Sequence, residues 1–457
     1  MISCSESNPT LSIEGGQVKG VATQTEGIIA YKGIPFAAPP VGDLRWKKPQ
    51  PIVPWEGVKT ADTYGAAAWQ TAWDPQSFYG REWRASGTVP FNEDCLYLNV
   101  WTPAAGKKDK KLPVAMWIHG GGYREGFAYE PEMDGGEAWA SRDVILVSVT
   151  YRLGIMGFFS HPLLSAEDPD GVSGNYGLLD QIAALKWIRN NIEQFGGDPD
   201  NITIFGQSAG AGSVQSLCAS PLSRNLIKKA ISMSGGGLNM TRPGILLDTA
   251  QLENQKLMDY FEITSPEAMR MLSFDSLREM AEDYSATTRK RISWSPVIDG
   301  YLLKNTFSKA AIEGEISDIP FMFGYTANDM NDATKAIADF CALRAEKSDK
   351  PAYAYLFARP LPGDENGAFH SSDLWYVFNS FSHSWRPFTA GDQELSQGIV
   401  DYWTNFAKYG NPNGKDKGLW TPYTLDNPKF MVFNADDDKA KFEMTETPEF
   451  RGPSEMK

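Results

Sequence analysis

A serine in the setting of a nucleophile lies near the middle of the chain. Residues 206–210 read Gly-Gln-Ser-Ala-Gly and place Ser208 between two glycines, after the apolar run 202–205 and before a helix-like stretch. A Gly-x-Ser-x-Gly sequence between a strand and a helix is typical of a strained turn. Such a turn lifts the hydroxyl clear of a sheet, at a helix N-terminus that favours negative charge. Ser208 is therefore our candidate nucleophile.

A serine hydroxyl needs a general base to attack at neutral pH. The chain has four histidines, His119, His161, His370 and His383. In hydrolases with this turn the order along the chain is serine, acid, histidine, which leaves the two histidines that follow Ser208. His370 follows the predicted strand 352–357 through a polar loop, where a base at a sheet edge is expected. His383 lies among aromatic residues, which is typical of a packed or rim histidine, so we favour His370.

The acid of such a triad should follow the strand that precedes the histidine's strand. The apolar run 319–324 is predicted to be that strand, and Asp329 and Asp332 come directly after it. Either carboxylate could orient the imidazole and stabilise its cation. A loop carboxylate can also simply cap the loop. Position favours Asp329 over Asp332.

A run of three glycines, Gly120, Gly121 and Gly122, follows the apolar run 114–118. Attack on an ester carbonyl places negative charge on oxygen, and backbone N–H groups reach that oxygen where no Cβ intervenes. The sequence His-Gly-Gly-Gly, together with the N–H of Ala209 after the nucleophile, is typical of the oxyanion hole of esterases. The alternative is a flexible turn, which the presence of Gly-x-Ser-x-Gly in the same chain makes the weaker interpretation.

The elements that must position these residues alternate between strand and helix patterns. Near-continuous apolar runs at 113–118, 143–150, 201–205, 319–324 and 352–357 suit parallel strands covered on both faces. Apolar residues at three- and four-residue spacing predict a helix over 178–195. The first hundred residues read as short antiparallel strands. We therefore expect an α/β fold, with a mostly parallel twisted sheet, helices on both faces and a small N-terminal antiparallel region, as one domain over 1–457.

These motifs together resemble the type B carboxylesterase family of the α/β-hydrolase fold, which includes cholinesterases and bacterial feruloyl esterases. The resemblance covers nearly the whole chain. It rests on segments 31–46 (YKGIPFAAPPVGDLRW), 93–100 (EDCLYLNV), 151–154 (YRLG), 174–181 (GNYGLLDQ), 195–199 (FGGDP) and 403–407 (WTNFA). It implies ester hydrolysis through an acyl-enzyme, with no metal and no organic cofactor.

The resemblance also implies roles for single residues. Ser208, Asp329 and His370 match the family's nucleophile, acid and base, and Gly121, Gly122 and Ala209 match its oxyanion donors. It further implies two buried ion pairs of architectural importance, Arg45 with Glu93 and Arg152 with Asp180.

The chain departs from the family at several of these positions. The acid is Asp329 where Glu is usual, and Met330 replaces the glycine that usually follows it. Gln207 precedes the nucleophile where relatives often carry Glu, so a cationic alcohol such as choline would gain less from this site. Cys95 lacks its usual partner, because that position is Ala68, which predicts a free core thiol. The segment from the acid to His370 is short, which predicts a more open active site.

Aromatic residues gather in segment 68–90, which the family places in a loop near its pocket mouth. Our candidate pocket residues are Trp69, Trp73, Trp83, Tyr123 and Trp294. Such rings can stack on an aryl group, which would suit feruloyl or other hydroxycinnamoyl esters. They can equally pack the loop against the body. Alternatives are a generalist esterase of short aliphatic esters, an amidase with the same triad, and a non-catalytic adhesion module of the same fold.

Composition limits the possible partners. The 457 residues carry 43 Lys and Arg against 57 Asp and Glu, a net charge of −14, which argues against nucleic acid as the main partner. No apolar run is long enough for a membrane span, and the four cysteines show no metal-ligand spacing. The first residues lack an apolar signal core, so the compartment is left open between secreted or periplasmic with the signal removed and cytoplasmic. The sequence does not fix the oligomeric state, and we expect a small-molecule ester as the partner.

Overall fold

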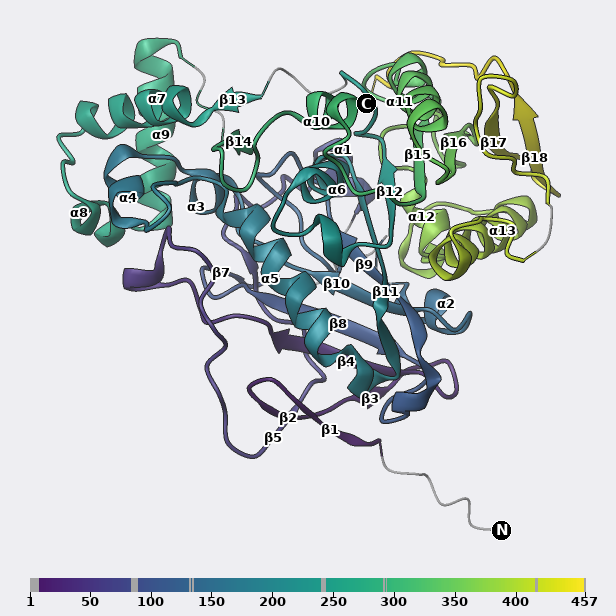
Figure 1. The fold of residues 1–457 in the computed structure, drawn as a ribbon, viewed down its shortest axis with the longest axis horizontal. Coiled ribbons are helices and arrows are strands. Elements are labelled where there is room, and N and C mark those ends of the chain that lie inside the picture. The colour runs from purple at the N-terminus through teal and green to yellow at the C-terminus, as the bar shows by residue number, and fades with distance from the viewer. Residues whose placement is uncertain are drawn as a thin grey trace.

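A large mixed sheet forms the centre of the molecule (Figure 1). The computed structural model describes residues 8–83, 89–130, 133, 135–239, 244–290, 292, 294–415 and 418–455. Within these residues eleven strands pair into one sheet. From edge to edge they are β18 (Ala440–Thr445), β17 (Phe430–Ala435), β16 (Ala352–Phe357), β15 (Phe321–Thr326), β12 (Lys229–Met233), β11 (Gly197–Gln207), β9 (Leu112–Ile118), β10 (Ile145–Val149), β8 (Tyr97–Thr102), β4 (Ile29–Pro35) and β3 (Val21–Ala22).

The middle of this sheet is parallel and its edges are antiparallel. All neighbours from β17 to β10 run parallel, whereas β18, β8, β4 and β3 pair antiparallel. The central strands are apolar and buried along their length. Strands that helices cover on both faces require this pattern. The prediction of a mostly parallel α/β sheet with an N-terminal antiparallel region is confirmed.

Smaller sheets flank the main one. They pair β1 (Thr10–Ile13), β2 (Gly16–Lys19) and β5 (Val58–Thr60), then β6 (Ala67–Ala68) with β7 (Phe91–Asn92), and β13 (Ile245–Leu246) with β14 (Val297–Ile298). The α-helices are α1 (Phe78–Glu82), α2 (Gly136–Ala140), α3 (Gly154–Phe158), α4 (Pro162–Glu167), α5 (Tyr176–Asn191), α6 (Ala209–Ala219), α7 (Leu247–Tyr260), α8 (Pro266–Met271), α9 (Phe274–Thr288), α10 (Phe307–Glu313), α11 (Thr334–Lys347), α12 (Leu374–Val377) and α13 (Ala390–Tyr409).

Helices α5 and α6 pack together and against β11, while α2 and α13 pack together, α2 against β8 and β10 and α13 against β9, β11 and β17. Helices α7, α8 and α9 stand apart at the left of Figure 1 and enclose a second cluster of buried apolar side chains, which includes Leu257, Met269 and Leu277. The predicted helix 178–195 is α5 followed by a short 3-10 turn, Ile192–Phe195.

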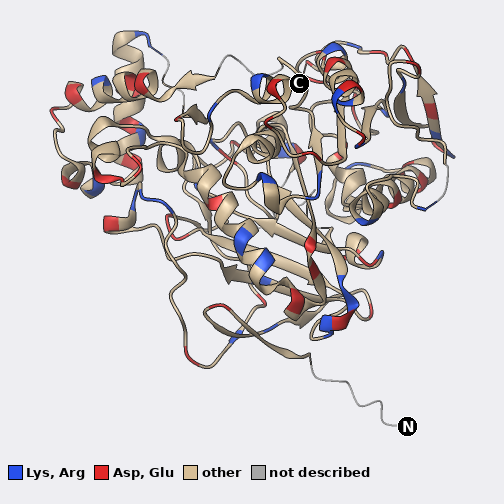
Figure 2. Cartoon of the chain, viewed as in Figure 1, with Lys and Arg blue, Asp and Glu red and all other residues tan. Residues whose placement is uncertain are grey.

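Charged residues of both signs are spread over the outer elements, and the central strands β9 and β10 carry none (Figure 2). The two ion pairs that the resemblance implied are present, with 2.5 Å between Arg45 Nη2 and Glu93 Oε2 and 2.7 Å between Arg152 Nη2 and Asp180 Oδ1. Cys95 is buried and free, as predicted. None of the helices formed by the described residues is long and apolar enough to cross a membrane.

Candidate active site

Four parallel strands end at the same edge of the sheet, and each leads into a segment that carries a candidate site residue. In spatial order these are β16, β15, β11 and β9, with β12 between β15 and β11. The carboxyl ends of parallel strands are where α/β folds place their ligands. This topology therefore brings together residues that lie far apart in the sequence.

Ser208 occupies a strained turn between β11 and α6. Its backbone has φ 56° and ψ −119°, a conformation that non-glycine residues adopt only when the surroundings hold it. The Ser208 N–H donates to Met233 O at 2.8 Å, and the Ser208 carbonyl accepts from Gly212 N at 3.0 Å. A Cβ on Gly210 would lie 2.1 Å from Ile118 O, so the turn passes too close to β9 for any other residue there. The half-buried Ser208 is thus held at the sheet edge.

Asp329 and His370 form a short buried hydrogen bond. His370 Nδ1 donates to Asp329 Oδ1 at 2.6 Å, and only 5% of His370 and 4% of Asp329 are exposed. Asp329 Oδ1 also accepts from Met330 N at 2.7 Å, and its Oδ2 accepts from Thr326 N at 3.2 Å. These hydrogen bonds fix the orientation of the Asp329 carboxylate. The carboxylate in turn orients the imidazole of His370 and holds its Nδ1 proton.

Hydrogen bonds join the loops that carry these two residues. The Asn328 side-chain oxygen accepts from Ala368 N at 3.0 Å, and Asn328 N donates to Ala368 O at 2.9 Å. Residues 451–454 lie along the same loops: Arg451 N donates to Ala327 O at 2.7 Å and Asn328 Nδ2 donates to Gly452 O at 3.1 Å. The relative position of Asp329 and His370 thus depends on three segments that are distant in sequence.

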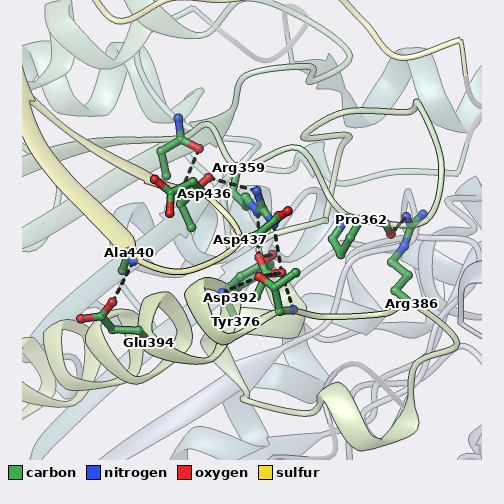
Figure 3. A network of polar contacts seen from close by, with 12 residues as sticks. Arg359, Pro362, Tyr376, Arg386, Asp392, Glu394, Asp436, Asp437 and Ala440 are labelled. Carbon is green, nitrogen blue, oxygen red and sulfur yellow. Dashed lines mark hydrogen bonds and ion pairs between the residues drawn. The ribbon is translucent and has the colours of Figure 1, made fainter.

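Buried arginines hold both ends of the long segment that contains His370. Near its start, Arg359 Nε donates to Asp392 Oδ1 at 2.8 Å, and Tyr376 Oη donates to the same oxygen at 2.7 Å (Figure 3). Near its end, Arg386 Nη1 donates to Pro362 O at 2.9 Å (Figure 3). The Nη2 of Arg386 pairs with Glu82 Oε2 at 2.8 Å. These contacts fix a segment that has little regular structure of its own.

The glycine turn after β9 lies beside Ser208 and lines the same cavity. Gly121 has φ +90° and Gly122 φ +63°, and a Cβ on Gly121 would lie 1.9 Å from Glu125 O. Among the hydrogen bonds of the described residues, none uses the backbone N–H of Gly121, Gly122 or Ala209. Three donors are therefore left for a ligand beside Ser208, which is the requirement for stabilising an oxyanion.

Two cavities meet at Ser208 and His370. One has a volume of about 1140 Å³ and contains Gly121 and Gly122 in its lining, and the other has a volume of about 260 Å³ and contains Ala209 and Asp329. Met330 lines both cavities. Ser208 and His370 therefore lie where the large and the small cavity adjoin.

Of the aromatic residues expected at the pocket, Trp73, Trp83 and Tyr123 line the large cavity. Trp69 and Trp294 are not part of the lining of either cavity. Trp69 stacks on Phe274 with ring centroids 5.3 Å apart, and Trp294 packs half-buried against the apolar clusters. These two rings pack against the apolar cluster of the α7–α9 helices. They are therefore not pocket residues.

Tyr79, on α1, belongs to the aromatic segment 68–90 but was not among our candidate pocket residues. Its ring lines the large cavity, and its hydroxyl donates to His370 O at 3.1 Å. The only sequence signal was its place among the aromatic residues around Trp83, on which it stacks at 5.7 Å. The alternatives to the acid and base lie elsewhere: Asp332 accepts from Thr334 N at the start of α11, and His383 is exposed.

Burial and nearby charge set the protonation of the site. Burial would lower the pKa of His370, but the carboxylates of Asp329 and, less strongly, Asp373 raise it above its usual value. Burial would raise the pKa of Asp329, but its interaction with His370 lowers it. Burial, with the Asp329 charge, raises the pKa of Asp373 to about 7. The ionised acid and a readily protonated imidazole are what general base catalysis requires.

No cluster of three or more candidate metal ligands occurs among the residues that the structure describes. The arrangement can instead support nucleophilic acyl transfer, with a serine hydroxyl, a paired imidazole and three free N–H donors around one space.

Comparison with known proteins supports the same chemistry. The model of the Carboxylesterase family matches residues 7–344 and 333–450. Fumonisin B1 esterase of Sphingopyxis macrogoltabida is 35% identical over 407 residues, which cover 87% of this chain and 69% of that protein. Para-nitrobenzyl esterase of Bacillus subtilis (strain 168) is 33% identical over 478 residues, which cover 92% of this chain and 94% of that protein.

Solved structures agree with the sequence matches. A thermophilic PNB esterase superposes with a TM-score of 0.81 at 29% identity, covering 96% of this chain and 98% of that chain. The α/β-hydrolase fold and the family resemblance are thereby confirmed. The chain belongs to the carboxylesterase family and is a carboxylic ester hydrolase.

Proposed function

We propose that the protein hydrolyses carboxylic esters in two steps, with Ser208 as nucleophile, His370 as general base and Asp329 as the acid that orients it. The observation that carries this proposal is the 2.6 Å hydrogen bond from His370 Nδ1 to Asp329, at a cavity that Ser208 also lines. With its Nδ1 proton held by Asp329, the imidazole has Nε2 available as the base.

In the first step Nε2 of His370 takes the Ser208 proton while Oγ bonds to the ester carbonyl carbon. The carbonyl oxygen becomes an oxyanion that accepts from the N–H groups of Gly121, Gly122 and Ala209. The carbon–oxygen bond to the alcohol then breaks, and His370 gives its proton to the departing oxygen. Water repeats the sequence on the acyl-enzyme and releases the acid and the free serine.

We further propose that one half of the substrate carries an aryl group. The lining of the large cavity includes Trp73, Tyr79 and Trp83. Aromatic walls of this kind hold planar rings by stacking. A relative named para-nitrobenzyl esterase supports this, because its name refers to an aromatic ester. Feruloyl and related hydroxycinnamoyl esters fit this description, and short aliphatic esters are the alternative.

A serine-directed fluorophosphonate tests the mechanism. We expect one equivalent of label on the wild type and none on Ser208→Ala, with thermal unfolding used to establish that the variant is folded. Stoichiometric labelling of Ser208→Ala would contradict the assignment.

A matched pair of esters and a matched pair of variants test the substrate class. Methyl ferulate and methyl hexanoate share the leaving group, so their kcat/KM values compare the acyl side alone. We expect ferulate to be preferred, and Trp73→Ala to lower that preference. Trp69→Ala is the control, because Trp69 lies in the same chain segment but outside the cavity lining. A preference for hexanoate in the wild type would refute an aryl group in the acyl half, and equal kcat/KM values for benzyl acetate and butyl acetate would refute one in the alcohol half.

A further inference from the structure

The side chain of Gln207 lies against the atom of His370 that the mechanism uses. Gln207 is the last residue of β11 and is 2% exposed, and its Nε2 is 3.1 Å from His370 Nε2. The Nδ1–H of His370 donates to Asp329, so the neutral ring carries its lone pair on Nε2. The amide N–H of Gln207 therefore donates to the lone pair that must accept the Ser208 proton.

The surrounding backbone leaves room for this amide. A Cβ on Gly120 would lie 2.9 Å from Gln207 Oε1 and 2.8 Å from the Gln207 carbonyl oxygen. The first glycine of the turn after β9 is therefore needed for close packing against Gln207. The amide reaches the base from the residue directly before the nucleophile, and it lines the large cavity.

We propose that Gln207 is a positioning residue that keeps His370 neutral, with its base nitrogen turned toward the nucleophile until the hydroxyl of Ser208 takes over that hydrogen bond. A donor to the neutral ring favours the neutral form, and protonated Nε2–H would face another N–H group. A carboxylate at the same position would do the opposite, because it would accept from the imidazolium and attract its charge. This inference rests on the proposed triad and adds control of the base to it.

The other groups around His370 either favour its charged form, bind its backbone or line the cavity that it faces. Asp329 faces it from the loop after β15, and Asp373 lies on its own segment. Tyr79, from α1, binds the His370 carbonyl and not the ring. Three further charged residues line the same cavity, namely Arg124, Glu125 and Glu130. Gln207 faces Nε2 itself, so substitution of Gln207 changes the charge and hydrogen bonding at the base while these groups are kept.

Two variants separate the hydrogen bond from the charge. Gln207→Met keeps a similar length without a donor or an acceptor, and Gln207→Glu replaces the donor with a carboxylate. We would measure the rate of labelling by a neutral fluorophosphonate as a function of pH, because its acidic limb reports the base in the free enzyme without a contribution from product release. Thermal unfolding of each variant checks that it is folded.

We expect the acidic limb to lie at increasing pH in the order wild type, Gln207→Met, Gln207→Glu, with the Glu variant about one pH unit above the wild type. A limb of Gln207→Met at or below that of the wild type overturns the inference, as does a limb of Gln207→Glu no higher than that of Gln207→Met. If Gln207→Glu does not fold, Gln207→Met alone decides. A Ser208→Ala variant that is still labelled refutes the triad itself, so the two failures are distinguishable.

Discussion

The side-chain oxygen of Asn328 accepts a hydrogen bond from the backbone N–H of Ala368 at 3.0 Å. Asn328 is the neighbour of Asp329 in the chain, and Ala368 lies two positions before His370. Together with the backbone bond from Asn328 N to Ala368 O, this contact holds the loops of Asp329 and His370 together without involving the side chain of Asp329 or His370. It gives a test of how far catalysis depends on the position of the acid and base.

We expect Asn328→Ala to lower kcat by about 10- to 100-fold with little change in KM, because small displacements of reacting groups are costly. Steady-state kinetics on a p-nitrophenyl ester measures both constants. Asn190→Ala is the matched control, since Asn190 is exposed near the end of α5 and outside both cavity linings. Equal kcat values for the two variants would show that the contact does not position the site.

The two glycines proposed for the oxyanion hole, Gly121 and Gly122, should respond differently to the same substitution. Gly121→Ala brings a Cβ to 1.9 Å from Glu125 O and must displace the turn, whereas Gly122→Ala meets no atom within 4 Å. We expect Gly121→Ala to lower kcat by about 10²–10³-fold, the value of a lost oxyanion donor. Gly122→Ala should keep activity within about tenfold, since it adds only the modest cost of a left-handed alanine. A larger loss in Gly122→Ala would contradict the assigned geometry.

The buried carboxyl of Asp373 should influence the pH profile of the enzyme. Its pKa is about 7, and its ionised form raises the pKa of His370. Removing that charge favours the neutral imidazole, so Asp373→Asn should move the acidic limb of kcat/KM to lower pH by roughly half a unit. Asp332→Asn, in the loop of the acid but bonded to Thr334 N, should leave the limb unchanged. A shift of the limb to higher pH in Asp373→Asn would contradict this prediction.

The ion pair of Glu82 with Arg386 should be important for stability. Only 2% of Glu82 and 5% of Arg386 are exposed, and the pair connects α1 to the segment of His370. Arg386→Met leaves a buried carboxylate without its cation, for which we expect a loss of about 3–5 kcal/mol in the free energy of unfolding.

Chemical denaturation measures this loss. The control is Lys335→Met, because the pair of Lys335 with Asp339 lies on the surface of α11, where such pairs contribute little. A loss no larger in Arg386→Met than in Lys335→Met would indicate that the Glu82 carboxylate finds another partner or is reached by water.

The sequence was sufficient for those parts of the fold and site that depend on local pattern. The predicted strand 352–357 coincides with β16, and the turn at Ser208 has the strained backbone that its glycines indicated. Strand order then explains why Asp329 and His370 meet, since their strands are parallel neighbours.

The rest depends on how distant loops pack, which local pattern does not encode. Trp69 and Trp73 are four residues apart in one aromatic segment, yet one stacks on Phe274 and the other lines the cavity. The contact of Gln207 with His370 likewise depends on a side-chain rotation allowed by Gly120. The single-domain organisation and the more open site remain predictions.

The segment 451–454 has a consequence for how the protein is made. It is hydrogen-bonded to the loop of Asp329 and, through Asn328, to that of His370, and it follows every strand of the main sheet. On the ribosome the sheet could assemble from the N-terminal end while its hydrolytic centre still lacked this support. We expect a chain that ends before residue 451 to carry Ser208, Asp329 and His370 and still to lack full activity.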